Sequence, residues 1–237
     1  MIGNINHRNL VKLWGFCADN QHKLLVYEYL ENGSLDKILF SDAELGLEQR
    51  YKIAVGTAKG LSYLHEECLE WVLHCDVKPQ NILLDDQLEP KVADFGMSKL
   101  FTDIHGIKDM QGTGFSKARG TRGYMAPEWM MNLNIDAKAD VYSYGIVLLE
   151  LLSGKSASIL ISALAKEYNE CNQLVQYVTE KIKKEGLKQV IDPRLLPEFE
   201  LKKLERLMKV ALLCVHEDRN ARPAMSKVVE ILLENIE

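Results

Sequence analysis

The chain has 237 residues, and its 29 Lys and Arg against 34 Asp and Glu give a formal net charge of −5. That length suits one to two ordinary domains of roughly 150 residues each. Apolar residues make up 47% and charged residues 27%, which excludes a disordered or low-complexity chain and predicts a sizeable core. Because nucleic-acid phosphates call for a basic surface, the slight acidity argues against a nucleic-acid partner.

Cysteine usage and hydropathy indicate the compartment. The five cysteines, Cys17, Cys68, Cys75, Cys171 and Cys214, form no Cys-x-x-Cys motif and no zinc-site spacing, so we expect free thiols in a reducing compartment. No stretch reaches the ~18 apolar residues of a membrane span. The first residues also lack the hydrophobic region of a signal peptide. The sequence as written therefore predicts a cytosolic-type chain without a membrane span.

The predicted elements begin with strands. Residues 9–16 and 23–29 are rich in β-formers and are separated by a polar turn. Apolar residues at helical spacing predict a helix over 47–66. Between 71 and 98, short apolar runs cut by proline and glycine suggest small hairpins with functional loops. Residues 99–124 are polar and lack periodicity, and a loop of that length is usually functional or mobile.

The second half of the chain is expected to be mostly helical. Residues 140–152 are apolar nearly all round, which predicts a buried central helix with Gly154 as its cap. Further helices are expected over 172–184, 201–215 and 224–236. Pro223 suits the first turn of the last one. The pattern as a whole predicts an α+β chain in which a helical domain follows a strand-rich beginning.

Three short motifs carry the chemistry. The run from His74 to Asn81 reads His-Cys-Asp-Val-Lys-Pro-Gln-Asn, and Asp-Phe-Gly begins at Asp94, eighteen residues after Asp76. Ala-Pro-Glu follows, ending at Glu128. In this order and spacing the motifs closely resemble the catalytic loop, the metal-binding loop and the end of the activation segment of eukaryotic protein kinases. One triplet alone would be weak evidence, whereas three in order are specific.

The residue types suit phosphoryl transfer, which needs positioning and charge neutralisation more than covalent chemistry. Asp76 would accept the proton of a substrate hydroxyl, and Lys78 would contact the γ-phosphate of ATP. Asn81 and Asp94 supply the hard oxygen ligands that Mg²⁺ prefers. Gly96 would let the chain turn sharply after the metal ligand. The alternative is that these carboxylates are ordinary surface aspartates near turns.

The resemblance also implies an ATP-binding site. The backbone of Glu28 and Leu30 would hold the adenine at a hinge, with Tyr27 as the gatekeeper residue. Leu83 would lie beneath the ring, and Lys78 would reach the phosphates. Simple core packing of the same strand is compatible with this role, because hinge contacts use the backbone.

Further residues match positions that organise the kinase site. Thr121 would hydrogen-bond the catalytic aspartate and lysine, although it could also be an ordinary turn threonine. Glu128 and Arg222 match a buried ion pair that braces this loop. Asp140 matches the aspartate that orients the backbone of the catalytic loop.

Two residues are given packing roles instead. His74 matches a structural histidine that packs in the core of kinases of this family. Phe95 is interpreted likewise as a core residue.

Four longer blocks, over 7–17, 29–35, 68–76 and 140–145, narrow the resemblance to plant receptor-like serine/threonine kinases of the S-domain (G-type lectin) group. Full-length members are single-pass plasma-membrane receptors. The resemblance therefore implies a kinase region on the cytoplasmic face of that membrane, with ATP and protein substrates as its partners. As a separate fragment the chain would be cytoplasmic.

The family fold implies two parts. Residues 1–30 would be a remnant of the N-lobe, holding the end of helix C, strands 4 and 5 and the hinge. Residues 31–237 would be the helical C-lobe, with the activation segment at 94–128. A protein-kinase-like fold is thus expected, mostly its C-lobe.

Cys75 departs from the family pattern, because it stands where an arginine usually precedes the catalytic aspartate. That arginine pairs with a phosphorylated activation loop. We hypothesise that phosphorylation of Thr113 or Ser116 therefore has little effect on turnover. Packing is a more plausible role for this thiol than redox sensing.

A second departure concerns ATP. The 237 residues contain no Gly-x-Gly-x-x-Gly loop and no Val-Ala-x-Lys lysine, and the helix glutamate that pairs with that lysine would precede Met1. We expect this polypeptide alone to phosphorylate poorly. Two hypotheses follow: a serine/threonine kinase catalytic region that uses Mg²⁺ and ATP, and a catalytically incompetent kinase that acts as a protein-interaction module.

Overall fold

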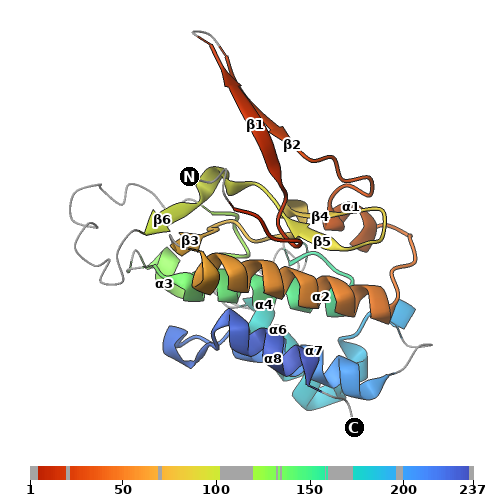
Figure 1. Ribbon diagram of the computed structural model, residues 1–237. Coiled ribbons are helices and arrows are strands. Elements are labelled where there is room, and N and C mark those ends of the chain that lie inside the picture. The colour runs from red at the N-terminus through yellow and green to blue at the C-terminus, as the bar shows by residue number, and fades with distance from the viewer. Residues whose placement is uncertain are drawn as a thin grey trace.

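The computed structural model describes residues 5–19, 22–68, 71–101, 120–131, 133, 135–157, 159, 173–195 and 200–234. Helices form the body of the molecule, and small antiparallel sheets lie along one side of it (Figure 1). One two-stranded ribbon projects away from that body. The α+β class expected from the sequence is confirmed.

The strands in the described part of the chain form three two-stranded antiparallel sheets: β1 (Leu13–Ala18) with β2 (Lys23–Tyr27), β3 (Trp71–Leu73) with β6 (Lys99–Phe101), and β4 (Ile82–Leu84) with β5 (Pro90–Val92). The first strand begins later than the predicted residue 9. Leu10 instead forms a parallel bridge with Val92, and the Val11 amide donates to the Val92 carbonyl at 2.9 Å. The chain before β1 is therefore tied to β5.

The helices are α1 (Leu35–Leu39), α2 (Leu47–Ser62), α3 (Pro127–Met130), α4 (Ala137–Ser153), α6 (Gln173–Glu185), α7 (Leu201–Cys214) and α8 (Met225–Leu233). A π-turn covers Tyr63–Glu67, and single 3-10 turns cover Pro79–Asn81, Phe95–Met97, Leu187–Gln189, Pro193–Leu195 and Arg219–Ala221. The predicted helices are present. The placement of Pro223 was wrong, because Ala224 caps α8 and the proline precedes that cap. No helix in these described segments is both long and apolar enough to cross a membrane.

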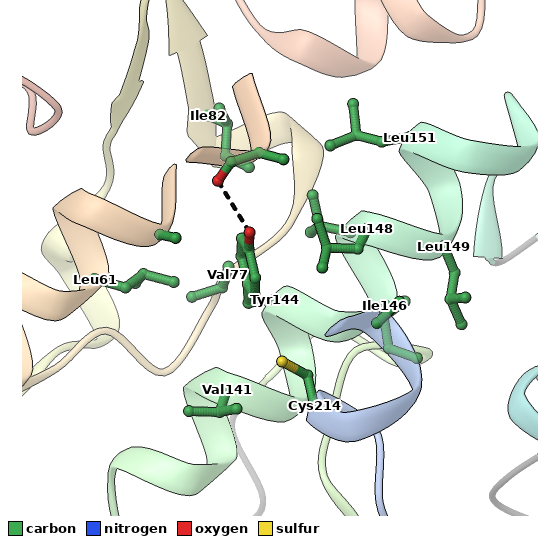
Figure 2. Close-up of a cluster of buried hydrophobic side chains, with 14 of the residues drawn as sticks. Leu61, Val77, Ile82, Val141, Tyr144, Ile146, Leu148, Leu149, Leu151 and Cys214 are labelled. Carbon is green, nitrogen blue, oxygen red and sulfur yellow. Dashed lines mark hydrogen bonds between the residues drawn. The ribbon is translucent and has the colours of Figure 1, made fainter. Parts of the chain in front are cut away.

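Helix α4 forms the centre of the core. Every residue from Ala139 to Ser153 is buried, which explains an apolar sequence on all its faces. Figure 2 shows Tyr144 and Leu148 of α4 among side chains from α2 and α7. The Tyr144 hydroxyl donates to the carbonyl of Ala54 at 2.9 Å, so its polar end is satisfied inside the core.

Two glycines set how closely α4 is packed and where it ends. A Cβ at Gly145 would lie 2.7 Å from side-chain atoms of Cys214 and Val215, so the missing side chain lets α7 approach. Gly154 adopts φ +65° and its amide donates to the Glu150 carbonyl at 2.8 Å. It ends the helix as predicted.

The segments that lead to the site pack directly on helix α2. A Cβ at Gly56 would lie 2.4 Å from Pro90, and one at Gly60 would lie 2.7 Å from the carbonyl oxygen of Asn9. The Asn9 side chain donates to the Pro90 carbonyl at 2.9 Å. The two glycines therefore let the start of β5 and the chain before β1 lie directly on the helix.

Candidate active site

The loop after β3 is anchored by one buried carboxylate. Asp140, in the first turn of α4, accepts the backbone amides of His74 at 2.8 Å and Cys75 at 2.9 Å. His65 contacts the same carboxylate through Nε2 at 2.9 Å. Burial opposes ionisation of Asp140, but the His65 hydrogen bond and the neighbouring donors prevail and lower its pKa. An ionised group inside the core thus fixes the backbone just before Asp76.

Asp76 lies at the centre of a closed polar network. Its Oδ1 accepts the Thr121 hydroxyl at 2.7 Å. Its Oδ2 accepts the Lys78 ammonium at 2.6 Å and the Asn81 side-chain amide at 3.1 Å. The Lys78 ammonium also donates to the Thr121 hydroxyl oxygen at 2.8 Å. Four predicted site residues from two distant segments are therefore brought into direct contact.

The network keeps Asp76 ionised. Burial by itself would raise the pKa of this carboxyl, but the hydrogen bonds from Lys78 and Thr121 outweigh burial and lower it. Its side chain is only 6% exposed, so the charge is held in a fixed direction. A carboxylate in this state can accept a proton from a hydroxyl group placed beside it.

Asp94 is placed next to this network by the hairpin of β4 and β5. The amide of Ala93, its preceding residue, donates to the Asn81 carbonyl at 2.8 Å. The Ala93 carbonyl in turn contacts Nε2 of His74 at 2.8 Å. The His74 ring packs edge-on against Phe95 with centroids 5.4 Å apart. The catalytic loop and the Asp-Phe-Gly loop therefore lie against each other.

Asn81 and Asp94 fit a divalent cation that also binds phosphate oxygens. The Asn81 amide nitrogen donates to the Asp76 backbone carbonyl and carboxylate, so its amide oxygen is the atom that could bind a cation. The Asp94 side chain is exposed. Within the described ranges, no group of three or more His, Cys, Asp and Glu side chains could hold a metal. A site formed by these two residues would therefore be completed by other oxygens, such as those of water or of a phosphate.

The chain turns directly after Asp94, and Gly96 is the central residue of the 3-10 turn Phe95–Met97. Asp94 itself adopts the left-handed conformation, with φ 63° and ψ 73°. The Gly96 amide donates to Asp94 Oδ1 at 3.2 Å, and a Cβ on this glycine would lie 3.0 Å from that oxygen. The glycine leaves room for the carboxylate, and the strained residue is the aspartate.

A small apolar cluster includes Ala93, the residue before Asp94. The buried residues Val11, Leu30 and Ala93 form a small cluster, and Leu83 packs against it. Ser34 and Leu83 form an antiparallel bridge, which draws the segment after β2 onto β4. Leu30 and Leu83, two of the three residues predicted to contact adenine, thus lie in one cluster with Ala93, the residue before Asp94.

The loop that carries Thr121 is tied to α4 at two points. The Tyr124 hydroxyl donates to Glu150 Oε1 at 2.7 Å, and the Ser143 hydroxyl donates to the Tyr124 carbonyl at 2.7 Å. The Ala157 amide donates to the same Oε1 at 2.7 Å. Burial raises the pKa of Glu150 to about 8, so this carboxyl is largely protonated near neutral pH.

A buried ion pair braces the end of this loop. Arg222 binds Glu128 through two parallel hydrogen bonds of 2.6 and 2.9 Å. The guanidinium also donates to the backbone carbonyls of Lys138 and His216 and lies over the Tyr142 ring. This bidentate geometry fixes α3 against the turn before α8.

Comparison with known proteins agrees with this geometry. Residues 1–232 match the family model described as a protein kinase domain. The chain belongs to the protein kinase family. ZmPK1 of Zea mays, whose name describes a receptor protein kinase, is 47% identical over 98% of this chain and 29% of that protein. Two G-type lectin S-receptor-like serine/threonine-protein kinases of Arabidopsis thaliana are each 44% identical over 98% of the chain. They are covered over 27% and 28% of their own lengths.

Family membership confirms the resemblance and the protein-kinase-like fold. The chain spans under a third of the length of these relatives. The catalytic and binding roles given to single residues are not tested by the comparisons and stay predictions.

The residues expected to organise the kinase site make the contacts described above. Cys75 is buried and adopts φ 66°, in keeping with a packing role. Thr113 and Ser116 lie outside the described residues, so the phosphorylation hypothesis stays a prediction. No disulfide joins the described cysteines Cys17, Cys68, Cys75 and Cys214.

Sequence reasoning missed three residues. His65 follows Leu64 on the buried face of the predicted helix. A buried histidine needs a polar partner, and this need was the one signal in the sequence. Glu150 interrupts the apolar run of residues 146–152, and a carboxyl there also needs partners. Lys91, which pairs with Glu28 at 2.9 Å, gave no signal. Its partner is 63 positions away.

Proposed function

We propose that this chain is the catalytic region of a receptor-like serine/threonine kinase, which transfers the γ-phosphoryl group of ATP to protein hydroxyls. The observation that carries the proposal is the ionised Asp76 carboxylate held between Lys78, Thr121 and Asn81. The names of the relatives, receptor-like serine/threonine kinases, support the choice of reaction and acceptor.

In the proposed reaction, the oxygen of a serine or threonine hydroxyl bonds to the γ-phosphorus. The bond from that phosphorus to the bridging oxygen breaks, and ADP leaves with the electron pair. Asp76 accepts the hydroxyl proton. Lys78, within 2.6 Å of Asp76, offsets the negative charge on the transferred group. Thr121 keeps both side chains aligned toward the acceptor.

The nucleotide would lie between the apolar cluster and the polar network. The backbone of Glu28 and Leu30 would bind the adenine, and Leu83 would support the ring. Asn81 and Asp94 would hold Mg²⁺, which would neutralise the phosphate oxygens when bound. Asp94 is exposed and Asn81 keeps its amide oxygen, so both can offer oxygen ligands to such an ion.

The wider setting is proposed from the same relatives. Their names describe receptor kinases, so we infer that the kinase region acts at the cytoplasmic face of the plasma membrane on protein substrates. We also propose that residues 1–30 belong to the N-lobe and residues 31–237 to the C-lobe, with the activation segment at 94–128.

Phosphate transfer from radiolabelled ATP with Mg²⁺ to a generic serine-rich protein tests the proposal. Asp76→Asn should reduce the rate about 10²- to 10⁴-fold, the usual contribution of a general base. The matched control is Asp86→Asn, an exposed aspartate on the turn between β4 and β5, and it should leave the rate unchanged. A rate that is insensitive to Asp76→Asn would contradict the proposal.

The alternative to this proposal is the second hypothesis from the sequence, a catalytically incompetent kinase. In this alternative the helical body is a protein-interaction module without catalysis. A folded wild-type chain that transfers no phosphate and binds no nucleotide would favour this alternative. Asp94→Asn helps to separate the two, since it should weaken Mg²⁺-dependent nucleotide binding only if the site is a kinase site.

A further inference from the structure

The adenine contact proposed for Glu28 uses only its backbone. Its side chain nevertheless makes several hydrogen bonds. Its Oε1 accepts the Lys12 amide at 2.7 Å and the Lys91 ammonium at 3.0 Å, and Oε2 accepts the same ammonium at 2.9 Å. The Glu28 amide donates to the Lys12 carbonyl at 3.0 Å. The side chains of Glu28 and Lys91 are only 19% and 17% exposed.

These contacts join the end of the β1–β2 ribbon to β5. Lys91 is the central residue of β5 and is paired with Leu83 on β4. It lies three positions before Asp94 in the chain. The Glu28–Lys91 pair therefore links the segment that leads to Leu30 directly to the strand that leads to Asp94.

The ribbon offers little other support for the position of Glu28. All five residues of β2 are exposed, and a two-stranded ribbon alone is marginally stable in water. A half-buried ion pair with charge-assisted hydrogen bonds is stronger than an exposed one. The position of the backbone at Glu28 should therefore depend on Lys91.

We propose that Lys91 and the Glu28 carboxylate are positioning residues for the nucleobase. The ion pair fixes the backbone of residues 28–30 against β5, beside the apolar cluster of Val11, Leu30, Ala93 and Leu83. It thereby sets the affinity for a planar base such as adenine, and it does not contact the phosphates. This inference rests on the proposed function, because it assumes that a nucleotide occupies the site.

Binding of two probes to the full chain tests the inference. The first probe is ADP with Mg²⁺, and the second is inorganic tripolyphosphate with Mg²⁺, which lacks a base. Lys91→Met should weaken ADP binding about tenfold, within the usual range of coupling between contacting residues. The affinity for tripolyphosphate should stay unchanged, because Asn81, Asp94 and Lys78 are intact. Lys91→Arg keeps the ion pair and should restore ADP affinity.

The matched control is Lys227→Met, which removes an exposed ion pair with Glu230 on α8 and should alter neither affinity. Glu28→Gln is the second variant, used where Lys91→Met fails to fold, and it should also weaken ADP selectively.

Each contrary outcome has a separate meaning. Unchanged ADP affinity in a folded Lys91→Met chain overturns the inference and leaves the proposed reaction standing. Equal weakening of both probes also overturns it, because a general loss of structure explains that result. A wild-type chain that binds neither probe overturns both this inference and the proposed function.

Discussion

The β1–β2 ribbon and helix α4 are both apolar in sequence, yet their surroundings differ completely. All five residues of β2 are exposed, and Phe16 on β1 is 76% exposed. In α4, every residue from Ala139 to Ser153 is buried. An apolar side chain stabilises a fold only through the area it removes from water. The body therefore carries the stability of the fold, and the ribbon contributes little of it.

The candidate site spans both regions. Asp76 and its network are tied through Asp140 and Glu150 to α4, the most buried element. Glu28 is held at the end of the ribbon by an ion pair to Lys91. The side proposed to bind phosphates is therefore supported by the core, whereas the side proposed to bind the base depends on a few polar contacts.

The largest effect should come from breaking the ion pair inside the body. Arg222→Met leaves the Glu128 carboxylate buried without its partner, which should lower the free energy of unfolding by about 3–5 kcal/mol. Urea unfolding followed by circular dichroism measures the change. Lys227→Met, on the exposed face of α8, serves as the control and should unfold at the wild-type midpoint. An Arg222→Met midpoint equal to wild type would show that the body does not depend on this pair.

A matched pair of leucines tests the comparison directly. Leu148→Ala in α4 opens a cavity in the core and should cost about 2–5 kcal/mol of unfolding free energy. Leu24→Ala in β2 removes a side chain that is 60% exposed and should cost less than about 0.5 kcal/mol. Thermal unfolding of both variants in one buffer gives the difference. Similar losses in the two would contradict the contrast between ribbon and body.

The next effect should appear as a pH dependence of stability produced by the buried carboxyl of Glu150. Burial raises the pKa of Glu150 from 4.5 to about 8 in the folded chain. Between these values the folded state keeps the proton that the unfolded state has lost, so stability should fall as pH rises through this window. Glu150→Gln should lack that slope, because it cannot ionise. Unfolding free energies of both proteins at several pH values measure the slope, and parallel curves would disprove the assignment.

The smallest change in stability is expected from the ribbon itself. Phe16→Ser should alter the free energy of unfolding by no more than about 0.5 kcal/mol. It should also reduce self-association at high concentration, because exposed apolar clusters favour it. Light scattering and urea unfolding of the same samples measure both effects. A large loss of stability would mean that Phe16 is covered in solution.

Much of the fold and site could be predicted because the signals are local. The apolar run of α4 and the glycine that ends it specify a buried helix directly in the sequence. The order of Asp76, Asn81 and Asp94 is likewise a local pattern. The predicted start of the first strand was wrong, because Leu10 pairs with Val92, a residue far along the chain.

The partners of ionisable groups could not be predicted either, because they lie far apart along the chain. His65 contacts Asp140, which lies 75 positions away, and Lys91 contacts Glu28, which lies 63 positions away. Neither distance is encoded in a local pattern. The left-handed backbone of Asp94 gave no signal in the sequence. A Cβ on Gly96 would crowd the carboxylate of Asp94, a contact that only the folded chain shows.

By itself, the sequence determined the element types and the family, because periodicity and motif spacing are short-range properties of the chain. The tertiary structure alone decided which apolar segment is buried and which charges are paired. Burial and ion pairing depend on surfaces brought together from distant parts of the chain, and their free energies exist only once those surfaces meet.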